Sequence, residues 1–388
     1  MRALCWNGIN DLAVENVPDP AIVNSHDAIL RVTMSTACGS DLHLLDGYIP
    51  TMSAGDVIGH EFMGEIVEVG PAVERVGVGQ RVVVPSFIGC GRCTYCQGDL
   101  WSLCDNTNPH PDLQLPEFGA STAGIYGYTQ AFGGYAGSHA EYVRVPFADN
   151  DCFAVEDGIT DEQAVFCSDA APTGFMGADL CGLTGGETIA IWGCGAVGLM
   201  AQRSALLLGA GRVIAIDCLP ERLRLAEGFG AETIDFSAGG SVVERLLEMT
   251  GGRGPDACIE AVGMEAVGTG FDYVYDRVKQ ALRLHTDRAE SLRQAAAACR
   301  KGGTLSVLGV FGVIDKFPMG VIMNKGLTLR SAQQHGQRYV ERLLDHVAKG
   351  DLDTAALATH RMSLSDSVRG YEMFKTKQDG CIRPVFTP

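Results

Sequence analysis

A short glycine-rich stretch limits the possible folds of this chain more than any other feature. The apolar run from Glu187 to Trp192 is typical of a buried strand. It leads directly into Gly193-Cys-Gly195-Ala-Val197-Gly198, which opens a helical stretch to about Leu208. Glycines at this spacing let a pyrophosphate approach the backbone, and the N-terminus of the helix holds its charge. The strand, the three glycines and the helix together predict a Rossmann unit.

An acid follows at the distance that such a unit requires. The next strand-like run, 212–217, ends in Asp217, 19 residues after Gly198. A carboxylate there bonds the ribose 2′-hydroxyl of the adenosine and repels a 2′-phosphate, so Asp217 favours NAD over NADP. Arg222 follows five residues later, where it either serves the cofactor or lies on a solvated helix face.

Strand-like and helical runs alternate from residue 187 onward, whereas short β-like runs and turns dominate before it. The chain is therefore predicted to be α/β, with a small, mostly β domain at 1–160, a doubly wound Rossmann domain at 161–325, and a segment 326–388 that finishes the sheet and returns to the first domain. The predicted strands include 28–32, 65–69, 81–84, 140–146, 256–262, 304–308 and 327–331, and the predicted helices include 160–171, 241–250, 289–300 and 336–347. Residues 107–138 are expected to form a long loop, and 264–288 an insertion with helical tendency.

Charge and composition limit which classes of molecule this chain is expected to bind. The 388 residues carry a formal net charge of −17, which disfavours nucleic acid or an anionic membrane as partner, although solubility alone explains such a charge. No apolar stretch approaches the roughly 20 residues that span a bilayer, and residues 1–13 do not have the pattern of a signal peptide. The chain has 14 cysteines, and the close clustering seen among them favours metal thiolates over a disulfide framework, so a reducing cytoplasm is expected.

Cys90, Cys93, Cys96 and Cys104 form the strongest single signal in the chain. Their spacing is C-x2-C-x2-C-x7-C. Four thiolates can close a tetrahedral zinc site, and with no open position such a site is structural. Its binding energy would stabilise a lobe at about 86–106 that has little core of its own. Iron–sulfur ligation and a disulfide pair are the weaker alternatives.

Cys38 and His60 indicate a second metal site. A thiolate, an imidazole and a carboxylate leave the fourth position of a zinc ion open, as a catalytic site requires. The carboxylate candidate is Asp169, but Cys167 competes with it, and spacing alone does not choose between them. Cys38 is a candidate only because Gly59-His60-Glu61 follows, since a lone cysteine is more often a small buried apolar residue.

The residues after Cys38 can move protons or fix a ligand. Ser40 can take a proton from a substrate and hand it to His43, which titrates near neutral pH. Asp41 can accept the other ring N–H of His60 and so orient a metal-bound imidazole. Taken alone, His43 is more often a surface residue, and Asp41 a turn or helix-cap residue.

With these motifs together, the chain resembles the zinc-dependent alcohol dehydrogenases of the medium-chain dehydrogenase/reductase superfamily over nearly its whole length. The resemblance rests on Cys38-Gly39-Ser40-Asp41, Gly59-His60-Glu61, the four-cysteine lobe and the Rossmann motif. It implies a GroES-like first domain, two Zn²⁺ sites, NAD, and homodimers or homotetramers that commonly pair their Rossmann sheets. Asp169, four residues before Thr173, makes the chain look most like the glutathione-independent formaldehyde dehydrogenases.

That branch implies roles for individual residues. Asp169, not Cys167, becomes the third ligand of the catalytic zinc, and Glu61 can also approach the ion. The substrate pocket is expected near Tyr48, Ser86, Phe87 and the 107–138 segment. Contacts to the cofactor carry over to Gly39, Ser40, His43, Thr173, Val197, Asp217, Arg222, Val262, Leu308, Val310, Gly336 and Gln337.

The chain differs from that branch at one place that affects the expected reaction. Formaldehyde-dismuting relatives carry an Arg and a His that clamp the dinucleotide where this chain has Ala266-Val-Gly-Thr269. Tight retention of NAD is therefore disfavoured. The predicted function is hydride transfer between a primary alcohol/aldehyde pair, short-chain or aromatic, and NAD. The alternatives are an aldehyde (formaldehyde) dehydrogenase or dismutase with tightly bound NAD and, from another class, a non-catalytic zinc- or NAD-binding protein.

Overall fold

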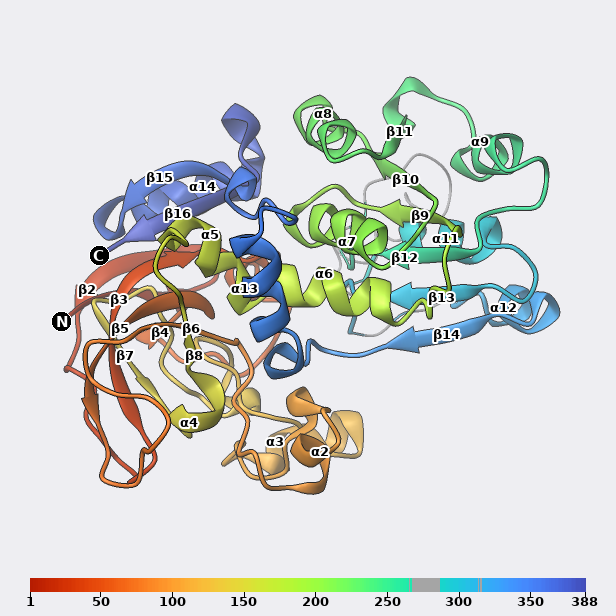
Figure 1. The fold of residues 1–388 in the computed structure, drawn as a ribbon. Coiled ribbons are helices and arrows are strands. Elements are labelled where there is room, and N and C mark those ends of the chain that lie inside the picture. The colour runs from red at the N-terminus through yellow and green to blue at the C-terminus, as the bar shows by residue number, and fades with distance from the viewer. Residues whose placement is uncertain (265, 267–286, 313, 315) are drawn as a thin grey trace. The chain divides into compact units, whose positions relative to one another are not determined.

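The computed structural model describes every residue except 265, 267–286, 313 and 315, and it divides into two compact units (Figure 1). Unit 1 comprises Met1–Pro172 and Gln334–Pro388, and unit 2 comprises Thr173–Gln333. Both divisions fall later in the chain than the expected boundaries after residues 160 and 325. The departure expected at 266–269 lies, apart from Ala266, outside the described residues, as does most of the 264–288 insertion.

Unit 1 is built on a seven-stranded sheet in the order β15-β16-β3-β5-β6-β8, with β7 paired to β3. Alternate residues such as Leu30 and Val32, or Val82 and Val84, are buried in one core with Phe62, as the two-residue period of a strand requires. The β-rich character expected of this part is confirmed. The strands are β3 Ala28–Thr36, β5 Glu61–Val69, β6 Arg81–Val84, β7 Tyr142–Val145, β8 Phe153–Ala154, β15 Ala358–Ser363 and β16 Arg383–Thr387.

Smaller elements complete unit 1. A three-stranded antiparallel sheet has the order β2-β1-β4. Its strands are β1 Arg2–Gly8, β2 Asp11–Asn16 and β4 Asp56–Val57. The helices of this unit are α1 Gly39–Leu45, α2 Thr94–Gln97, α3 Pro111–Phe118, α4 Ala148–Asp151, α5 Asp161–Ala164, α13 Val340–Ala348 and α14 Ser367–Thr376.

Two expectations about unit 1 are wrong. Residues 107–138 are not one long loop, because Pro111 at the first helical position and left-handed Gly119 at the end delimit α3. The helix expected over 160–171 is interrupted. Thr160 caps α5 (Asp161–Ala164), a 3-10 turn follows over Val165–Ser168, and Asp169 leaves helical geometry (φ −148°, ψ −64°) before α6 begins (Ala170–Asp179).

Unit 2 is a parallel six-stranded sheet in the order β11-β10-β9-β12-β13-β14. Its central strands are apolar runs buried along their length, as a sheet covered on both faces requires. This order is that of a Rossmann fold and reverses between β9 and β12, where such sheets bind dinucleotides. The strands are β9 Thr188–Trp192, β10 Arg212–Asp217, β11 Glu232–Asp235, β12 Ala257–Glu260, β13 Thr304–Val307 and β14 Thr328–Ser331, and the helices are α7 Ala196–Leu207, α8 Pro220–Gly228, α9 Val242–Met249, α11 Glu290–Ala298 and α12 Met319–Lys325 (Figure 1).

Candidate catalytic and metal-binding sites

The pairing of β3 with β5 brings Cys38 and His60 together. Thr36 pairs with Glu61 in this antiparallel ladder, so Cys38 follows the end of one strand where His60 precedes the start of the other. One ligand atom each from Cys38, His60 and Glu61 lie within 4.8 Å of one another. A thiolate, an imidazole and a carboxylate at this separation suit zinc.

Asp169 reaches the same cluster because the chain leaves helical geometry there. Its Oδ2 lies 3.7 Å from His60 Nε2 and accepts a hydrogen bond of 2.7 Å from Ser86 Oγ. Ser86, expected near the substrate, therefore also supports this carboxylate. The competing Cys167 is fully buried in the preceding turn, where burial raises the pKa of its thiol to about 12. The position of Asp169 beside His60, held by Ser86, favours Asp169 as the ligand; the thiol pKa does not discriminate, because burial raises the pKa of Cys38 as well.

Glu61 lies beside Cys38 and His60, but its carboxylate is already paired with the guanidinium of Arg383. Arg383 Nη1 is 2.9 Å from Glu61 Oε1, and Arg383 Nη2 is 3.9 Å from Cys38 Sγ. Burial raises the pKa of Glu61 to about 7, while the guanidinium of Arg383 works to lower it. Arg383 was not identified from the sequence, because it stands 345 positions from Cys38 and belongs to no local motif.

Asp41 lies behind His60, in the supporting position expected for it. Its Oδ1 is 3.1 Å from His60 Nδ1, and its Oδ2 accepts hydrogen bonds of 2.8 Å from the Cys38 backbone N–H and from the Tyr371 hydroxyl. Burial works to raise the pKa of Asp41, but His60 and these hydrogen bonds lower it to about 2. A charged Asp41 favours a proton on Nδ1 and leaves Nε2 available to a metal.

Ser40 and His43 lie one turn apart on α1, a spacing that places side chains on the same face of a helix. Ser40 Oγ is 3.3 Å from Cys38 Sγ and 3.4 Å from His60 Nε2, so a hydroxyl stands beside two candidate ligands. His43 is buried and not a surface histidine. Gly39 is the first residue of α1, whose N-cap is Cys38.

An aromatic group from the 107–138 segment borders the same cluster. The ring of Tyr128 meets the ring of His60 edge to face at a centroid distance of 6.3 Å, and Tyr128 packs on Phe132 at 5.3 Å. Phe87 belongs to the same buried apolar cluster as Tyr128. The backbone N–H of Tyr48 donates to the His43 carbonyl at 2.9 Å. The sequence placed the segment near the substrate but did not single out Tyr128, which follows no period.

The four cysteines of the predicted structural site converge. One ligand atom each of Cys90, Cys93, Cys96 and Cys104 lie within 4.8 Å of one another. Backbone N–H groups point at the sulfurs, among them those of Cys93 on Cys90 Sγ (3.4 Å) and Asn106 on Cys104 Sγ (3.4 Å). Hydrogen bonding to Cys96 lowers the pKa of Cys104 to about 4. The same hydrogen bond raises the pKa of Cys96. Four sulfur ligands at this separation fit one tetrahedral zinc ion without an open position.

Two positions of the glycine motif in unit 2 have no room for a side chain. Gly193 has a φ of +94°, and a Cβ on Gly198 would lie 1.8 Å from the Gly193 carbonyl oxygen, so both positions require glycine. Val197 lies in the first turn of α7. Arg222 Nη1 would be 3.6 Å from a Cβ on Gly195, which places the guanidinium beside the motif and not on a solvated face.

Asp217 ends β10 and is buried beside this motif. Its Oδ2 accepts a hydrogen bond of 2.7 Å from the backbone N–H of Cys194, and its Oδ1 accepts one of 2.7 Å from that of Cys218. The carboxylate thus lies between the glycine motif and the loop before α8. This is where a Rossmann unit holds the adenosine ribose.

The remaining cofactor candidates lie at three places. Val262, Leu308 and Val310 follow the carboxyl ends of β12 and β13, the edge at which parallel sheets bind ligands. Thr173 lies in α6. Gly336 and Gln337 belong to unit 1, where Gln337 Nε2 donates to the Phe87 carbonyl (2.6 Å) and to Asp151 Oδ1 (2.8 Å).

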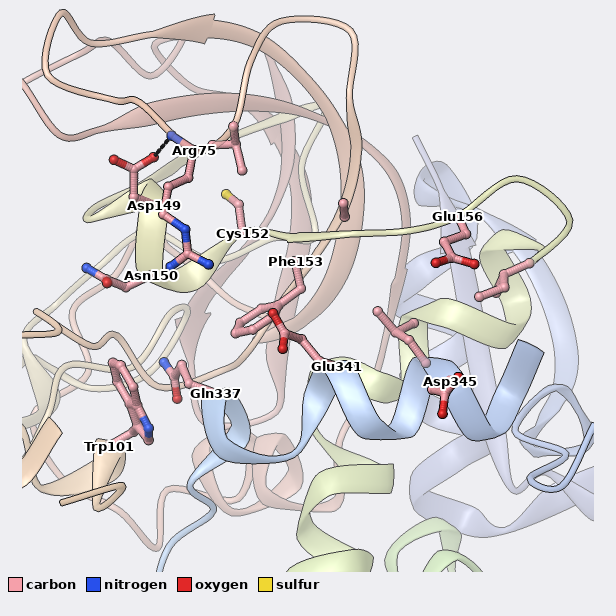
Figure 2. Close-up of a pocket in the computed structure, with 14 residues that line it drawn as sticks. Arg75, Trp101, Asp149, Asn150, Cys152, Phe153, Glu156, Gln337, Glu341 and Asp345 are labelled. Atoms are coloured by element: carbon pink, nitrogen blue, oxygen red, sulfur yellow. Dashed lines mark hydrogen bonds between the residues drawn. The ribbon is translucent and has the colours of Figure 1, made fainter. Parts of the chain in front are cut away.

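Unit 1 also contains a cavity of about 520 Å³, and its lining residues differ from those of the Cys38–His60 cluster. Its lining includes Trp101, Asn150 and Phe153, together with Gln337, Glu341 and Asp345 from the α13 region (Figure 2). The backbone N–H of Arg75 donates to Asp149 at its rim. Among the residues that the structure describes, none of the candidate metal ligands lines this cavity. The cavity is therefore separate from the catalytic cluster.

Comparisons with known proteins agree with this arrangement. Residues 24–157 match the alcohol dehydrogenase GroES-like domain, and residues 196–349 match the zinc-binding dehydrogenase family. The chain is 38% identical to the zinc-type alcohol dehydrogenase-like protein AdhB of Bacillus subtilis, over 100% of both. The solved alcohol dehydrogenase TADH from Thermus sp. ATN1 superimposes with a TM-score of 0.84 at 32% identity, covering 100% of this chain and 99% of that one. The glutathione-independent formaldehyde dehydrogenase of Bacillus subtilis is 31% identical over 96% of this chain and 94% of its own, so the branch favoured by Asp169 is the more distant relative.

Proposed function

This chain belongs to the zinc-type alcohol dehydrogenases of the medium-chain dehydrogenase/reductase superfamily, and we propose that it transfers a hydride between NAD and a primary alcohol/aldehyde pair, short-chain or aromatic. The observation that carries the proposal is the position of Ser40 Oγ, within 3.4 Å of both Cys38 Sγ and His60 Nε2. A proton acceptor beside an incomplete set of metal ligands is what oxidation of an alcohol requires.

The side chains of the cluster divide the chemical work. Cys38, His60 and Asp169 would hold a zinc ion with its fourth position open, and such an ion acts as a Lewis acid that lowers the pKa of an alcohol. Ser40 Oγ would accept the hydroxyl proton of the alcohol, and His43, one turn further along α1, would be the group that finally receives it. Asp41 orients the His60 ring, and Arg383 balances the negative charge of Glu61. Glu61 is the additional ligand candidate because its carboxylate lies within reach of the same position.

A second zinc ion on the four cysteines is proposed to be structural. The lobe around Cys90–Cys104 has short helices and turns in place of a sheet, so the ion would supply the stability that its small core lacks.

NAD is proposed as the cofactor because of Asp217. Its buried carboxylate would accept a hydrogen bond from a ribose hydroxyl. A 2′-phosphate at this place would instead be repelled by the negative charge of Asp217. The positive charge of Arg222 beside the glycine motif can serve the phosphates or ribose of either cofactor, so NADP must be tested directly.

The experiment that tests the function is an absorbance screen for NADH with zinc-loaded protein. Alcohols and aldehydes are each run with and without added NAD, and with NADP in its place. Turnover only with added NAD supports the proposal. Consumption of aldehyde without any added cofactor would instead establish the dismutase with retained NAD. No turnover of any substrate by fully zinc-loaded protein would leave a non-catalytic zinc- or NAD-binding protein.

A homodimer through unit 2 is also proposed. β14 is the last strand in the described sheet order, and all four of its residues are exposed. The neighbouring α12 exposes Met319 and Met323 (56% and 72%). An open sheet edge beside apolar side chains favours pairing with a second copy.

The partners and compartment follow from charge and cysteine chemistry. The net charge of −17 disfavours nucleic acid. In the described part of the chain, no helix combines the length and the apolar character needed to cross a bilayer. All cysteines are described and none forms a disulfide, which supports the proposal of a reducing, cytoplasmic setting.

A further inference from the structure

A line of buried side chains begins at Asp41, beside the metal ligand His60. The Tyr371 hydroxyl donates to Asp41 Oδ2 at 2.8 Å. The same hydroxyl oxygen lies 2.9 Å from His139 Nε2, and His139 Nδ1 lies 2.8 Å from Ser35 Oγ. Tyr371, His139 and Ser35 are each at most 1% exposed. Water therefore does not compete for these hydrogen bonds, and each is stronger than it would be at the surface.

The carboxylate at one end fixes the donor and acceptor roles along this line. Asp41 can only accept, so Tyr371 uses its single O–H on it. The Tyr371 oxygen then accepts from the Nε2–H of His139, and the bare Nδ1 accepts from the Ser35 hydroxyl. This arrangement needs a neutral His139, and burial lowers the pKa of His139 to about 4. Near neutral pH the four groups therefore have one consistent set of hydrogen bonds.

Packing holds the two rings of the line in place. Phe386 stacks on Tyr371 (interplanar angle 16°) and meets His139 edge to face (83°). On the other side lies Gly59, directly before His60. Gly59 has a φ of +97°, and a Cβ there would lie 2.6 Å from His139 Cγ, so glycine is what allows the His139 ring to approach the chain at this point.

We propose that Tyr371 and His139 are positioning residues for the metal ligand His60, acting through Asp41. Asp41 Oδ1 lies 3.1 Å from His60 Nδ1, and within the described structure neither of these two atoms has another partner. The orientation of the imidazole therefore depends on the orientation of this carboxylate. The Cys38 N–H and the Tyr371 O–H hold its other oxygen, and loss of the phenol O–H leaves a single hydrogen bond to prevent rotation.

This inference rests on the proposed catalytic zinc site and extends it to residues that do not touch the ion. It assigns to α14 and to the segment before β7 a part in metal binding that local motifs do not reveal. Partners of this kind typically change metal affinity by about 10- to 100-fold when they are removed. Tyr371 reaches the metal ligand through one more hydrogen bond than Asp41 does. A change in metal affinity near the lower end, about tenfold, is therefore expected.

The test compares Tyr371→Phe with Tyr126→Phe in the full chain. Tyr126 is equally buried in unit 1, and its hydroxyl has no partner among the described residues, so it controls for loss of a buried phenol O–H. Zinc affinity is measured by competition with a chromophoric chelator, and the visible spectrum of the cobalt(II) form separates the one-thiolate site from the four-thiolate site. Tyr371→Phe should weaken metal binding at the Cys38 site about tenfold. It should shift the cobalt bands of that site and leave the four-cysteine site unchanged.

Three results would overturn the inference. These are unchanged affinity in Tyr371→Phe, a loss no larger than in Tyr126→Phe, or equal loss at both sites. If Tyr371→Phe does not fold, His139→Leu and His139→Gln decide. Gln can still donate to the Tyr371 oxygen, so only Leu should weaken metal binding, and equal affinities would refute the inference. If the unsubstituted chain binds no metal at the Cys38 site, the proposed function itself fails.

Discussion

Arg383 Nη1 lies 2.9 Å from Glu61 Oε1, so the first residue of β16 is joined to the first residue of β5. Both side chains are buried. A buried ion pair is costly to break from one side, because the remaining charge loses its partner but stays away from water. The pair therefore links the C-terminal strand to the residue directly after His60.

Arg383→Met should lower the free energy of unfolding by about 3 kcal/mol. The double variant Glu61→Gln/Arg383→Met should be less destabilised, since no unpaired carboxylate remains. The folded-state pKa of Glu61, about 7, is raised, so the stability linked to its protonation is present below the unfolded value and is lost as pH rises through 7. Without Arg383 the deficit should therefore be larger at pH 8 than at pH 5. Denaturant unfolding at both values measures this, and equal losses in the single and double variants would contradict it.

Asp169→Ala should remove the catalytic zinc and lower kcat/KM by about 100-fold or more, because the ion loses a charged ligand. Cys167→Ala is the matched control, since it deletes the competing ligand two residues away. It should retain two zinc ions per chain and most of the activity. Metal analysis and steady-state kinetics on both proteins decide the assignment, and the reverse pattern would make Cys167 the ligand.

Asp217→Asn should lower kcat/KM for NAD by about 10- to 100-fold, the cost of a lost charge-assisted hydrogen bond. Turnover with NADP should rise, because the like charge opposite a 2′-phosphate is gone. Asp235 ends the neighbouring strand β11 and pairs with Asp217 in register, so Asp235→Asn is a matched control. If it alters the preference as much as Asp217→Asn does, Asp217 is not the residue that selects the cofactor.

His335 should make the protein sensitive to acid. Burial lowers the pKa of His335 to about 4, and Ser102 lies 3.0 Å from its Nδ1. A depressed pKa contributes stability that is present above the unfolded value of about 6.5 and is lost as pH falls through 4. The contribution is about 2 kcal/mol after allowance for partial solvent screening.

His335→Asn keeps an acceptor near the position of Nδ1 but cannot be protonated. Its unfolding free energy should therefore fall less between pH 6.5 and pH 4 than that of the unsubstituted chain. His360→Gln, on half-buried β15, is the control. Equal acid sensitivity in His335→Asn and the unsubstituted chain would show that other groups cause it.

Leu329→Lys should weaken the proposed homodimer. Leu329 is 41% exposed on β14, and a charge on an open edge opposes strand pairing. Leu115→Lys, which adds the same charge at an exposed leucine of α3 in unit 1, should leave assembly unchanged. Sedimentation velocity over a concentration series distinguishes the two, and a monomeric unsubstituted chain would refute the dimer.

The features that could be predicted well from the sequence are those whose residues lie close together along the chain. The four cysteines lie within one short segment, and the strand, glycines and acid of the Rossmann unit have fixed spacings, so the convergence of the cysteines and a doubly wound parallel sheet could be predicted from pattern. The strand order of unit 2 was not predicted. The supporting groups of the catalytic cluster do not. Arg383, Tyr371 and His139 reach it only through strand pairing and helix packing between distant parts of the chain, which no local period encodes.

The break in the predicted helix at Asp169 has a similar origin. Helical propensity favours continuation from Thr160 to Ala171, but the Asp169 carboxylate is held by Ser86, on the segment after β6. Tertiary contacts therefore override the local preference at the residue that is proposed to bind metal. Backbone direction and the hydrogen bond from Ser86 favour Asp169 over Cys167, between which spacing alone did not choose.

The β3–β5 register has a consequence for how the protein matures. A slip of one residue between these strands would turn alternate side chains to the opposite face and carry Cys38 away from His60. An ion that needs both donors binds only the correctly aligned ladder, and binding withdraws that form from the folding equilibrium. Zinc at the proposed site would therefore add to the preference for this register, which the buried side chains of β3 and β5 already favour.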